Sequence, residues 1–178
     1  NAIDRTIGAL KVCADKINAN KVIETRNVAT EACRQAGNGD EFLQKVKAET
    51  GLTLETISSD EEARLTLEGC YGLLDPKVPY AVVFDIGGGS TELMWVKQEP
   101  HSSTQGGTTM IDAISVPSGV VSLCEEFGSG VIGQSAFAEI GSHFADELNA
   151  FDERHEISSE IKNGNVQMLG TSGTVTTL

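Results

Sequence analysis

Residues 82–93 read VVFDIGGGSTEL, and this stretch decides what the rest of the chain is expected to form. An apolar, β-branched segment leads to the carboxylate of Asp85, turns on three glycines and resumes as Ser-Thr-Glu before LMWV at residues 93–96. The alternation on both sides of a glycine turn predicts a β-hairpin whose charged groups gather at its tip.

The glycines and the carboxylate at this tip suit phosphate chemistry. Residues without a Cβ let backbone N–H groups approach a phosphate closely, and a concave set of such donors binds anions. Asp85 beside them suits a hard divalent cation, which neutralises the charge of phosphoryl oxygens. The stretch is neither a P-loop nor the dinucleotide fingerprint, because no Gly-Lys-Ser/Thr follows and the turn leads into a strand.

Residues 168–178, MLGTSGTVTTL, form a second stretch of this kind. An apolar segment meets small and hydroxylated residues, which are expected to lead into a helix whose first N–H groups face an anion. An ordinary glycine-rich turn is the alternative for either loop taken alone. Two such loops, each ending a strand of the same chain, favour phosphate binding.

Four separated blocks resemble the Ppx/GppA family, the exopolyphosphatases and guanosine pentaphosphate phosphohydrolases of the actin-like ATPase superfamily. They are ATEACR at residues 29–34, EEAR at 61–64, DIGGGSTE at 85–92 and GTSGT at 170–174. They stand in the family's order and at its spacing, so the resemblance covers essentially the whole chain. It implies an α/β fold of the ribonuclease H-like, actin-like ATPase type.

The resemblance also implies a piece of a longer protein. Family members begin with another Asp-Gly phosphate loop and continue well past the second phosphate loop found here. Residues 1–76 are expected to be the C-terminal part of a first α/β lobe, and residues 80–178 the N-terminal part of a second, ribonuclease H-like lobe. The piece alone is expected to be weakly active or inactive.

The composition indicates a globular protein. The 178 residues are 39% hydrophobic and 22% charged, and no apolar run approaches the roughly 20 residues that span a bilayer. The four cysteines are scattered and form neither a metal-ligand pair nor a disulfide framework, which favours reduced thiols in a cytoplasmic protein. No membrane partner is expected.

The net charge of −13 is unevenly distributed. Residues 1–79 carry 10 basic and 13 acidic side chains, whereas residues 80–178 carry 3 and 13. The second part would repel a polyanion by itself, so a divalent cation or basic groups elsewhere must supply attraction. The same balance argues against nucleic-acid binding, which normally requires a basic surface.

Periodicity predicts the order of helices and strands. Helices at residues 2–18, 38–50 and 59–74 alternate with strands at 21–29 and 52–58, which is typical of a parallel α/β unit. The later part is predicted to hold a hairpin at 80–85 and 90–97, a strand at 109–116 and a helix through Phe127. A longer helix with Phe137 and Phe151 on one face and a strand at 166–169 follow.

Asp85 and Glu92 are the expected metal ligands, for Mg²⁺ or another divalent cation, as the resemblance implies. The alternative for Asp85 is a turn-forming carboxylate that bonds nearby backbone N–H groups. Ser90 and Glu92 alternate on the second hairpin strand, so they face one side. The resemblance assigns phosphate binding to Ser90 and metal or water placement to Glu92, and the alternative is a satisfied polar pair.

Glu62 has two interpretations. From the residues alone, Ser59 at the N-cap and Glu62 at N3 form a capping box. The resemblance instead places Glu62 at the position associated with water activation. There it would act as a general base for the in-line attack of water on the terminal phosphorus. Glu61 would then be an acid on the helix surface.

The remaining expected phosphate contacts come from loop backbone and from one guanidinium. Arg34 could grip a phosphoryl oxygen with its planar fork, and its alternative is a surface ion pair. Arg64 is expected to be a structural ion-pair partner. The full set of expected phosphate-binding residues is Arg34, Gly87, Gly88, Ser90, Gly173 and Thr174.

Together these expectations describe metal-assisted hydrolysis of terminal phosphoanhydride bonds in inorganic polyphosphate or guanosine pentaphosphate. Nothing in the 178 residues separates the two substrates, because both end in the same phosphoryl anhydride. The alternatives are a nucleotide-binding ATPase or sugar kinase of the same superfamily, and a non-catalytic piece. A homodimer of the full-length protein is compatible with the resemblance.

Overall fold

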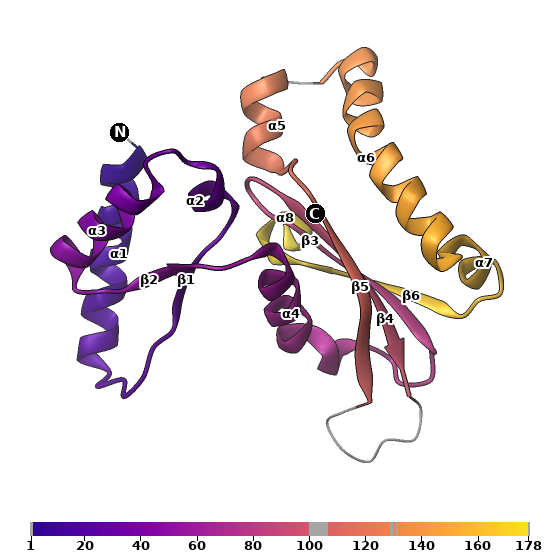
Figure 1. The fold of residues 1–178 in the computed structure, drawn as a ribbon, viewed down its shortest axis with the longest axis horizontal. Helices are drawn as coiled ribbons and strands as arrows, with labels where there is room; N and C mark the ends of the chain where they lie inside the picture. Colours follow the sequence, from indigo (N-terminus) through magenta and orange to yellow (C-terminus); the bar gives the residue numbers. More distant parts are fainter. Residues whose placement is uncertain (1, 100–106, 129, 131, 178) are drawn as a thin grey trace. The chain divides into compact units, whose positions relative to one another are not determined.

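The computed structural model describes residues 2–99, 107–128, 130 and 132–177 (Figure 1). The chain divides into two compact units, Asn1–Ser58 and Ser59–Leu178. Both units combine helices with a small sheet, as the alternation of sequence periods predicts.

The first unit is built on a helix pair. Ile7 and Ala14 of α1 pack against Val46 of α3 and against Leu52 to form its core. Gly51 ends α3 in the left-handed conformation, with φ of 73°, and its N–H bonds to the Lys47 carbonyl. This confirms the predicted terminal glycine. Its elements are α1 (Ala2–Ala19), β1 (Asn27–Ala29), α2 (Glu31–Gln35), α3 (Gly39–Thr50) and β2 (Leu54–Thr56).

The strands of the first unit are shorter than expected. β1 and β2 pair in parallel over three residues each, so the strands predicted at residues 21–29 and 52–58 are wrong at their ends. Lys21 has a positive φ of 50° where the chain leaves α1, and Ile23 is 96% exposed. The apolar pair at residues 22–23 therefore lies outside the core cluster found among the described residues of this unit, and the ladder starts only at Asn27.

The second unit is a four-stranded sheet in the order β5-β4-β3-β6, covered by helices. β3 pairs antiparallel with β4, which pairs antiparallel with β5, and β6 runs parallel to β3 on its other side. Figure 1 shows β6 beside β3, although β4, β5 and the helices α5 to α7 come between them in the chain. The elements are α4 (Ser59–Cys70), η1 (Tyr71–Leu73), β3 (Tyr80–Ile86), β4 (Thr91–Gln98), β5 (Thr108–Val116), α5 (Val120–Phe127), α6 (Gln134–His155), α7 (Ile157–Lys162), β6 (Val166–Thr171) and α8 (Ser172–Thr176).

The two faces of this sheet carry separate cores. On one face, Ala63 and Leu67 of α4 pack against Val83 and Met94. On the other face, Phe151 of α6 and Ile157 of α7 pack against Trp95 and its neighbours. Because side chains alternate along a strand, each strand supplies both cores.

Sequence periodicity predicts these elements well, with three exceptions. The predicted helix at residues 59–74 ends at Cys70 and continues as the short helix η1. Helix α7 was not expected. Phe137 is 73% exposed whereas Phe151 is only 1% exposed, so the predicted apolar face of α6 is buried only toward its C-terminal end.

Helix α4 belongs to the second compact unit. Its apolar side chains, among them Ala63, Leu67 and Cys70, lie in the core of the four-stranded sheet, so the compact units divide at Ser58–Ser59. The lobe boundary expected at residues 76–80 comes from the family resemblance and stays a prediction. The division into compact units places α4 together with the strands that follow it.

Gly170 provides a test of how tightly β6, β3 and α8 are packed. A Cβ at this position would lie 2.7 Å from Cζ of Phe84 and 2.8 Å from Cγ1 of Val175. We expect Gly170→Ala to lower the free energy of unfolding by about 1–3 kcal/mol, because the neighbours must move. Urea denaturation measures the change.

The matched control is Gly141→Ala in helix α6, where a Cβ would meet nothing within 4 Å. This substitution should stabilise the protein by about 0.5–1 kcal/mol, since alanine restricts the unfolded chain and favours helix. Equal effects at both positions would contradict the close packing at Gly170.

Candidate functional site

Four polar residues stand in register across the sheet of the second unit. Thr171 of β6 is opposite Asp85 of β3, Asp85 is opposite Glu92 of β4, and Glu92 is opposite Ser115 of β5. Directly opposite residues in neighbouring strands project to the same face. We call Thr171, Asp85, Glu92 and Ser115 the polar row.

The polar row lies on the face that α4 covers. Val83 and Met94 belong to the core beneath α4, and each is two residues from a carboxylate of the row, Asp85 or Glu92. Since side chains alternate along a strand, Asp85 and Glu92 point to this same side. The apolar core therefore ends in a line of polar groups at the carboxyl end of β3.

Glu92 is buried, with 1% of its surface exposed. Its Oε1 accepts a hydrogen bond from Oγ of Ser90 at 2.7 Å and another from Oγ of Ser115 at 2.8 Å. Burial raises the pKa of Glu92, the two hydroxyls oppose this, and the negative charges of Glu62 and Asp85 raise the pKa further. The folded protein thus favours the protonated form of this carboxyl more than the unfolded chain does.

Asp85 carries a buried oxygen that lacks a partner. Among the described residues, nothing hydrogen-bonds to its Oδ1, although that atom is buried. Its Oδ2 receives a long contact of 3.5 Å from Oγ1 of Thr66. Buried carboxylate oxygens normally have partners because leaving one bare is costly. A bare oxygen here suits a bound cation or a donor from a ligand.

Helix α4 brings a further carboxylate to this place. Glu62 and Thr66 are one helical turn apart and therefore on the same side of α4. Thr66 contacts Asp85, and the charge of Glu62 acts on Glu92. The three predicted catalytic acids, Glu62, Asp85 and Glu92, are therefore brought together.

The capping-box interpretation of Glu62 is wrong, because the helix starts one residue earlier than that interpretation requires. α4 begins at Ser59 itself, which puts Ser58 at the N-cap position and Glu61 at N3. Glu61 turns its carboxylate toward Arg64 on the outer side of the helix, with distances of 2.7 and 2.9 Å to Nε and Nη2. Glu61 is thus a surface acid, as expected.

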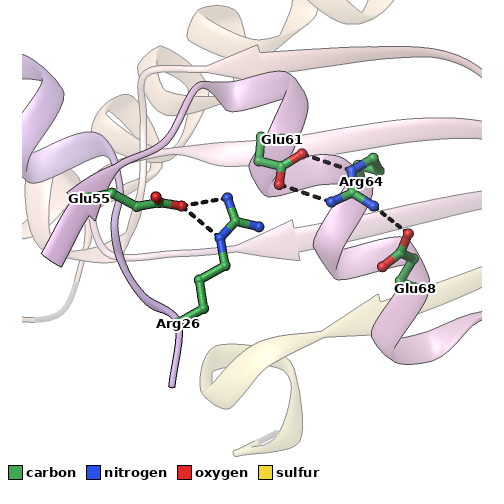
Figure 2. Close-up of polar contacts among 5 residues, drawn as sticks. All are labelled: Arg26, Glu55, Glu61, Arg64 and Glu68. Atoms are coloured by element: carbon green, nitrogen blue, oxygen red, sulfur yellow. Dashed lines mark hydrogen bonds and ion pairs between the residues drawn. The ribbon is translucent and has the colours of Figure 1, made fainter. Parts of the chain in front are cut away.

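Figure 2 shows this surface ion-pair cluster. Arg64 lies between Glu61 and Glu68 of α4, which confirms its predicted structural role. The same figure draws a pair in the first unit, Arg26 with Glu55, whose Nη2 to Oε1 distance is 2.5 Å.

The two glycine-bearing loops meet at the carboxyl ends of β3 and β6. Oγ of Ser172 and Oγ1 of Thr174 both donate to the carbonyl oxygen of Ile86, each at 2.9 Å. Ser172 has a positive φ of 71°, a conformation that is strained for a serine. Parallel neighbours end at the same sheet edge, which is where ligands bind in open α/β sheets.

The glycine loop is oriented by helix α5. The carbonyls of Gly87 and Gly88 accept hydrogen bonds from the first N–H groups of α5, at 3.0 Å from Val120 and 2.8 Å from Val121. The described residues contain no cis peptide bond, and the C=O and N–H of a trans peptide point in opposite directions. The N–H groups of Gly88 and Gly89 therefore point away from α5, and within the described residues they donate to no acceptor.

Several of the expected phosphate-binding groups already donate their hydrogen bond to an acceptor within the protein. The N–H of Gly87 donates to the Ser90 carbonyl at 2.9 Å, and the hydroxyl of Ser90 donates to Glu92. The hydroxyl of Thr174 donates to Ile86. The N–H of Gly88, by contrast, has no acceptor among the described residues. A Cβ at Gly173 would meet nothing within 4 Å. The phosphate-binding roles of all these residues stay predictions.

Arg34 lies in the first unit, in the ion pair that was its alternative interpretation. Its Nε and Nη2 are each 2.9 Å from Oε2 of Glu31, and its Nη1 donates to the Ile57 carbonyl at 2.8 Å. These contacts hold the residues that follow β1 and β2 together. A role on a phosphate stays a prediction.

Three residues of the site were not expected from the sequence. Thr66 could have been found, because it follows Glu62 by one helical turn. Ser115 could have been found from the strand register, because it lies opposite Glu92. The role of Gly119 could not have been found from the sequence, because it depends on a contact between segments that are distant in the chain. A Cβ at Gly119 would lie 2.5 Å from the carbonyl carbon of Gly88.

Across the residues that the structure describes, no three His, Cys, Asp or Glu side chains are arranged to hold a metal. The bare Oδ1 of Asp85 with Glu92 opposite still fits Mg²⁺, which keeps several waters and takes one or two protein carboxylates. No helix in the described part of the chain is long and apolar enough to cross a bilayer.

Comparison with known proteins gives a consistent answer. The family model described as the Ppx/GppA phosphatase family matches residues 1–178. Exopolyphosphatase 1 of Mycobacterium leprae is 31% identical over 127 residues, which is 71% of this chain and 34% of that protein. The crystal structure of the Aquifex aeolicus member of the Ppx/GppA protein family is 33% identical, with a TM-score of 0.60 over 84% of this chain and 46% of that one.

An exopolyphosphatase from Cytophaga hutchinsonii, 21% identical, shares the fold with a TM-score of 0.77 over 97% of this chain and 51% of that one. The chain therefore spans from about a third to about half of the length of these relatives. Because these structures have the actin-like ATPase fold, the predicted fold class is confirmed.

The buried Glu92 predicts how stability depends on pH. A carboxyl whose pKa is raised in the folded state contributes full stability below its unfolded pKa of about 4.3, and this contribution is lost as pH rises through the folded pKa. Glu92→Gln cannot ionise and keeps an oxygen for both serines. We expect it to be more stable than the wild type at pH 7, with the difference shrinking toward pH 4.

Urea denaturation between pH 4 and pH 8 in the presence of a chelator measures this difference. The control is Glu139→Gln, at an exposed position of α6, which should change the free energy of unfolding by less than about 0.5 kcal/mol at every pH. A Glu92→Gln variant that loses stability as pH rises would show that the hydroxyl bonds outweigh burial.

Proposed function

Because the chain belongs to the Ppx/GppA phosphatase family, we propose that the full-length protein hydrolyses terminal phosphoanhydride bonds and releases orthophosphate. The substrates are inorganic polyphosphate or guanosine pentaphosphate. The name of the Mycobacterium leprae relative, an exopolyphosphatase, supports this substrate class. The resemblance of the four sequence blocks is confirmed by the match of the family model to the whole chain.

The observation that carries the proposal is the buried Oδ1 of Asp85, for which the described residues supply no hydrogen-bond partner, where the two glycine-bearing loops meet. Asp85 and Glu92 would hold a divalent cation at this place, and the cation would neutralise charge on the phosphoryl oxygens. Glu92 would bind the cation through Oε2, because both serine hydroxyls bond to its Oε1.

The glycine loop would receive the phosphate oxygens. The N–H groups of Gly88 and Gly89 point away from α5 and have no acceptor among the described residues, so they are available to an anion. A Cβ at Gly88 would be 3.4 Å from Cγ2 of Val121, an ordinary contact, and Gly88 is not in the left-handed conformation. Neither packing nor backbone strain demands glycine there, which supports close approach of a ligand as the reason.

Glu62 would act as the general base. It stands on the side of α4 that faces Asp85 and Glu92, where a water between the helix and the phosphate could be deprotonated. The attack is in line: the water oxygen bonds to the terminal phosphorus, the bond to the bridging oxygen breaks, and Glu62 takes the proton. The shortened chain leaves as an anion.

Phosphate release from both substrates by the purified full-length protein tests the proposal. We expect release with Mg²⁺, loss of release with a chelator and recovery on adding Mg²⁺ back. Absence of release from either substrate under these conditions would overturn the hydrolase proposal. Binding of an adenine nucleotide without hydrolysis of polyphosphate would instead support the ATPase or kinase alternative.

The acids on α4 allow a matched pair of variants. We expect Glu62→Gln to lower the turnover number about 100-fold or more, because it removes the general base while keeping the side-chain shape. Glu61→Gln should stay within about twofold of the wild type, because Glu61 bonds Arg64 on the outer side of the same helix. Steady-state phosphate release, normalised to folded protein, measures both.

If Glu62→Gln lowers stability but leaves turnover per folded molecule unchanged, the acid has a structural role. Equal losses from Glu61→Gln and Glu62→Gln would contradict the assignment of the base to Glu62 and point to the charge of α4 as a whole.

A further inference from the structure

Ser115 lies near the end of β5, directly opposite Glu92 in the strand register. Its hydroxyl donates to Oε1 of Glu92 at 2.8 Å, and the hydroxyl of Ser90 donates to the same oxygen at 2.7 Å. The two donors differ in origin. Ser90 is two residues from Glu92 in the same chain segment, so it moves with Glu92, whereas Ser115 belongs to another strand.

We infer that Ser115 is a positioning residue, which fixes the Glu92 carboxylate relative to the sheet so that Oε2 faces the site beside Asp85. This inference rests on the proposed function and names a further residue that serves it. The last torsion of a glutamate side chain is broad, so the carboxylate turns easily unless it is held. Two hydroxyls on Oε1 select one orientation, and within the described residues no donor reaches Oε2.

The segment that carries Ser115 is itself held in place. Oγ1 of Thr91, next to Glu92, donates to the Ser118 carbonyl at 2.7 Å, and Val116 is buried. Gly119 then packs against the backbone of Gly87 and Gly88. The segment from Ser115 to Gly119 thus contacts both Glu92 and the glycine loop. The backbone that carries the Ser115 hydroxyl is therefore held in place.

A purely structural role for Ser115 would have different consequences. The hydroxyl could simply satisfy a buried carboxylate oxygen, and its loss would then lower stability without changing turnover per folded molecule. A positioning role instead lowers the turnover number while substrate affinity changes little, because Ser115 does not contact the substrate. Restoring a hydroxyl at the same place should then restore turnover.

The experiment uses the full-length protein and inorganic polyphosphate with Mg²⁺. We expect Ser115→Ala to lower kcat about 10-fold or more, as is common for groups that orient a catalytic ligand, with KM within about twofold. Ser115→Thr keeps the hydroxyl on a β-strand position and should recover most of kcat. The control is Thr109→Ala at an exposed position of the same strand, which should behave as the wild type.

Urea denaturation of each variant separates folding from function. If Ser115→Ala does not fold, Ser115→Cys keeps the volume with a much weaker donor and should show the same loss of kcat. A Ser115→Ala or Ser115→Cys variant with wild-type kcat overturns the inference, and so does a Ser115→Thr variant as impaired as Ser115→Ala. In both cases an active wild type leaves the proposed function standing, whereas an inactive wild type overturns the two together.

Discussion

The pairing of β3 with β4 on one side and with β6 on the other is the constraint on which the second unit depends. It sets Asp85 opposite Glu92 and Thr171, and it brings the Ile86 carbonyl to Ser172 and Thr174. A slip of one residue would turn the carboxylates to the opposite face and take Val83 and Met94 out of the core. The apolar core therefore specifies the register that the polar row needs.

One side of helix α4 covers both the apolar core and the polar row. Ala63, Leu67 and Cys70 pack on the middle of the sheet, and Glu62 and Thr66 stand beside the polar row. The apolar contacts stabilise this arrangement, while burial of the Glu92 carboxyl opposes it. The same helix that covers the core thus brings Glu62 near Glu92, and the negative charges of Glu62 and Asp85 add to the burial that raises the pKa of Glu92.

The sequence predicts the second unit better than the first for physical reasons. The hairpin, the helix after Gly119 and the strand at residue 166 follow from strong periodicity and glycine turns. Residues 22–23 have strand propensity, but they are exposed and pair with no strand in the described part of the chain, so β1 begins only at Asn27. Ser115 and Gly119 matter through contacts across the sheet and with a distant loop, which no local pattern encodes.

The first turn of α5 shows how a helix terminus can act through a loop. Its N–H groups are bonded to the carbonyls of Gly87 and Gly88, so they are not available to bind an anion themselves. Each of those peptides then directs its own N–H away from the helix, and its dipole continues the direction of the helix dipole. A side chain at Gly119 would push the loop off this terminus. The positive end of α5 is therefore extended through the glycine loop to N–H groups that point away from the helix, where an anion could accept from them.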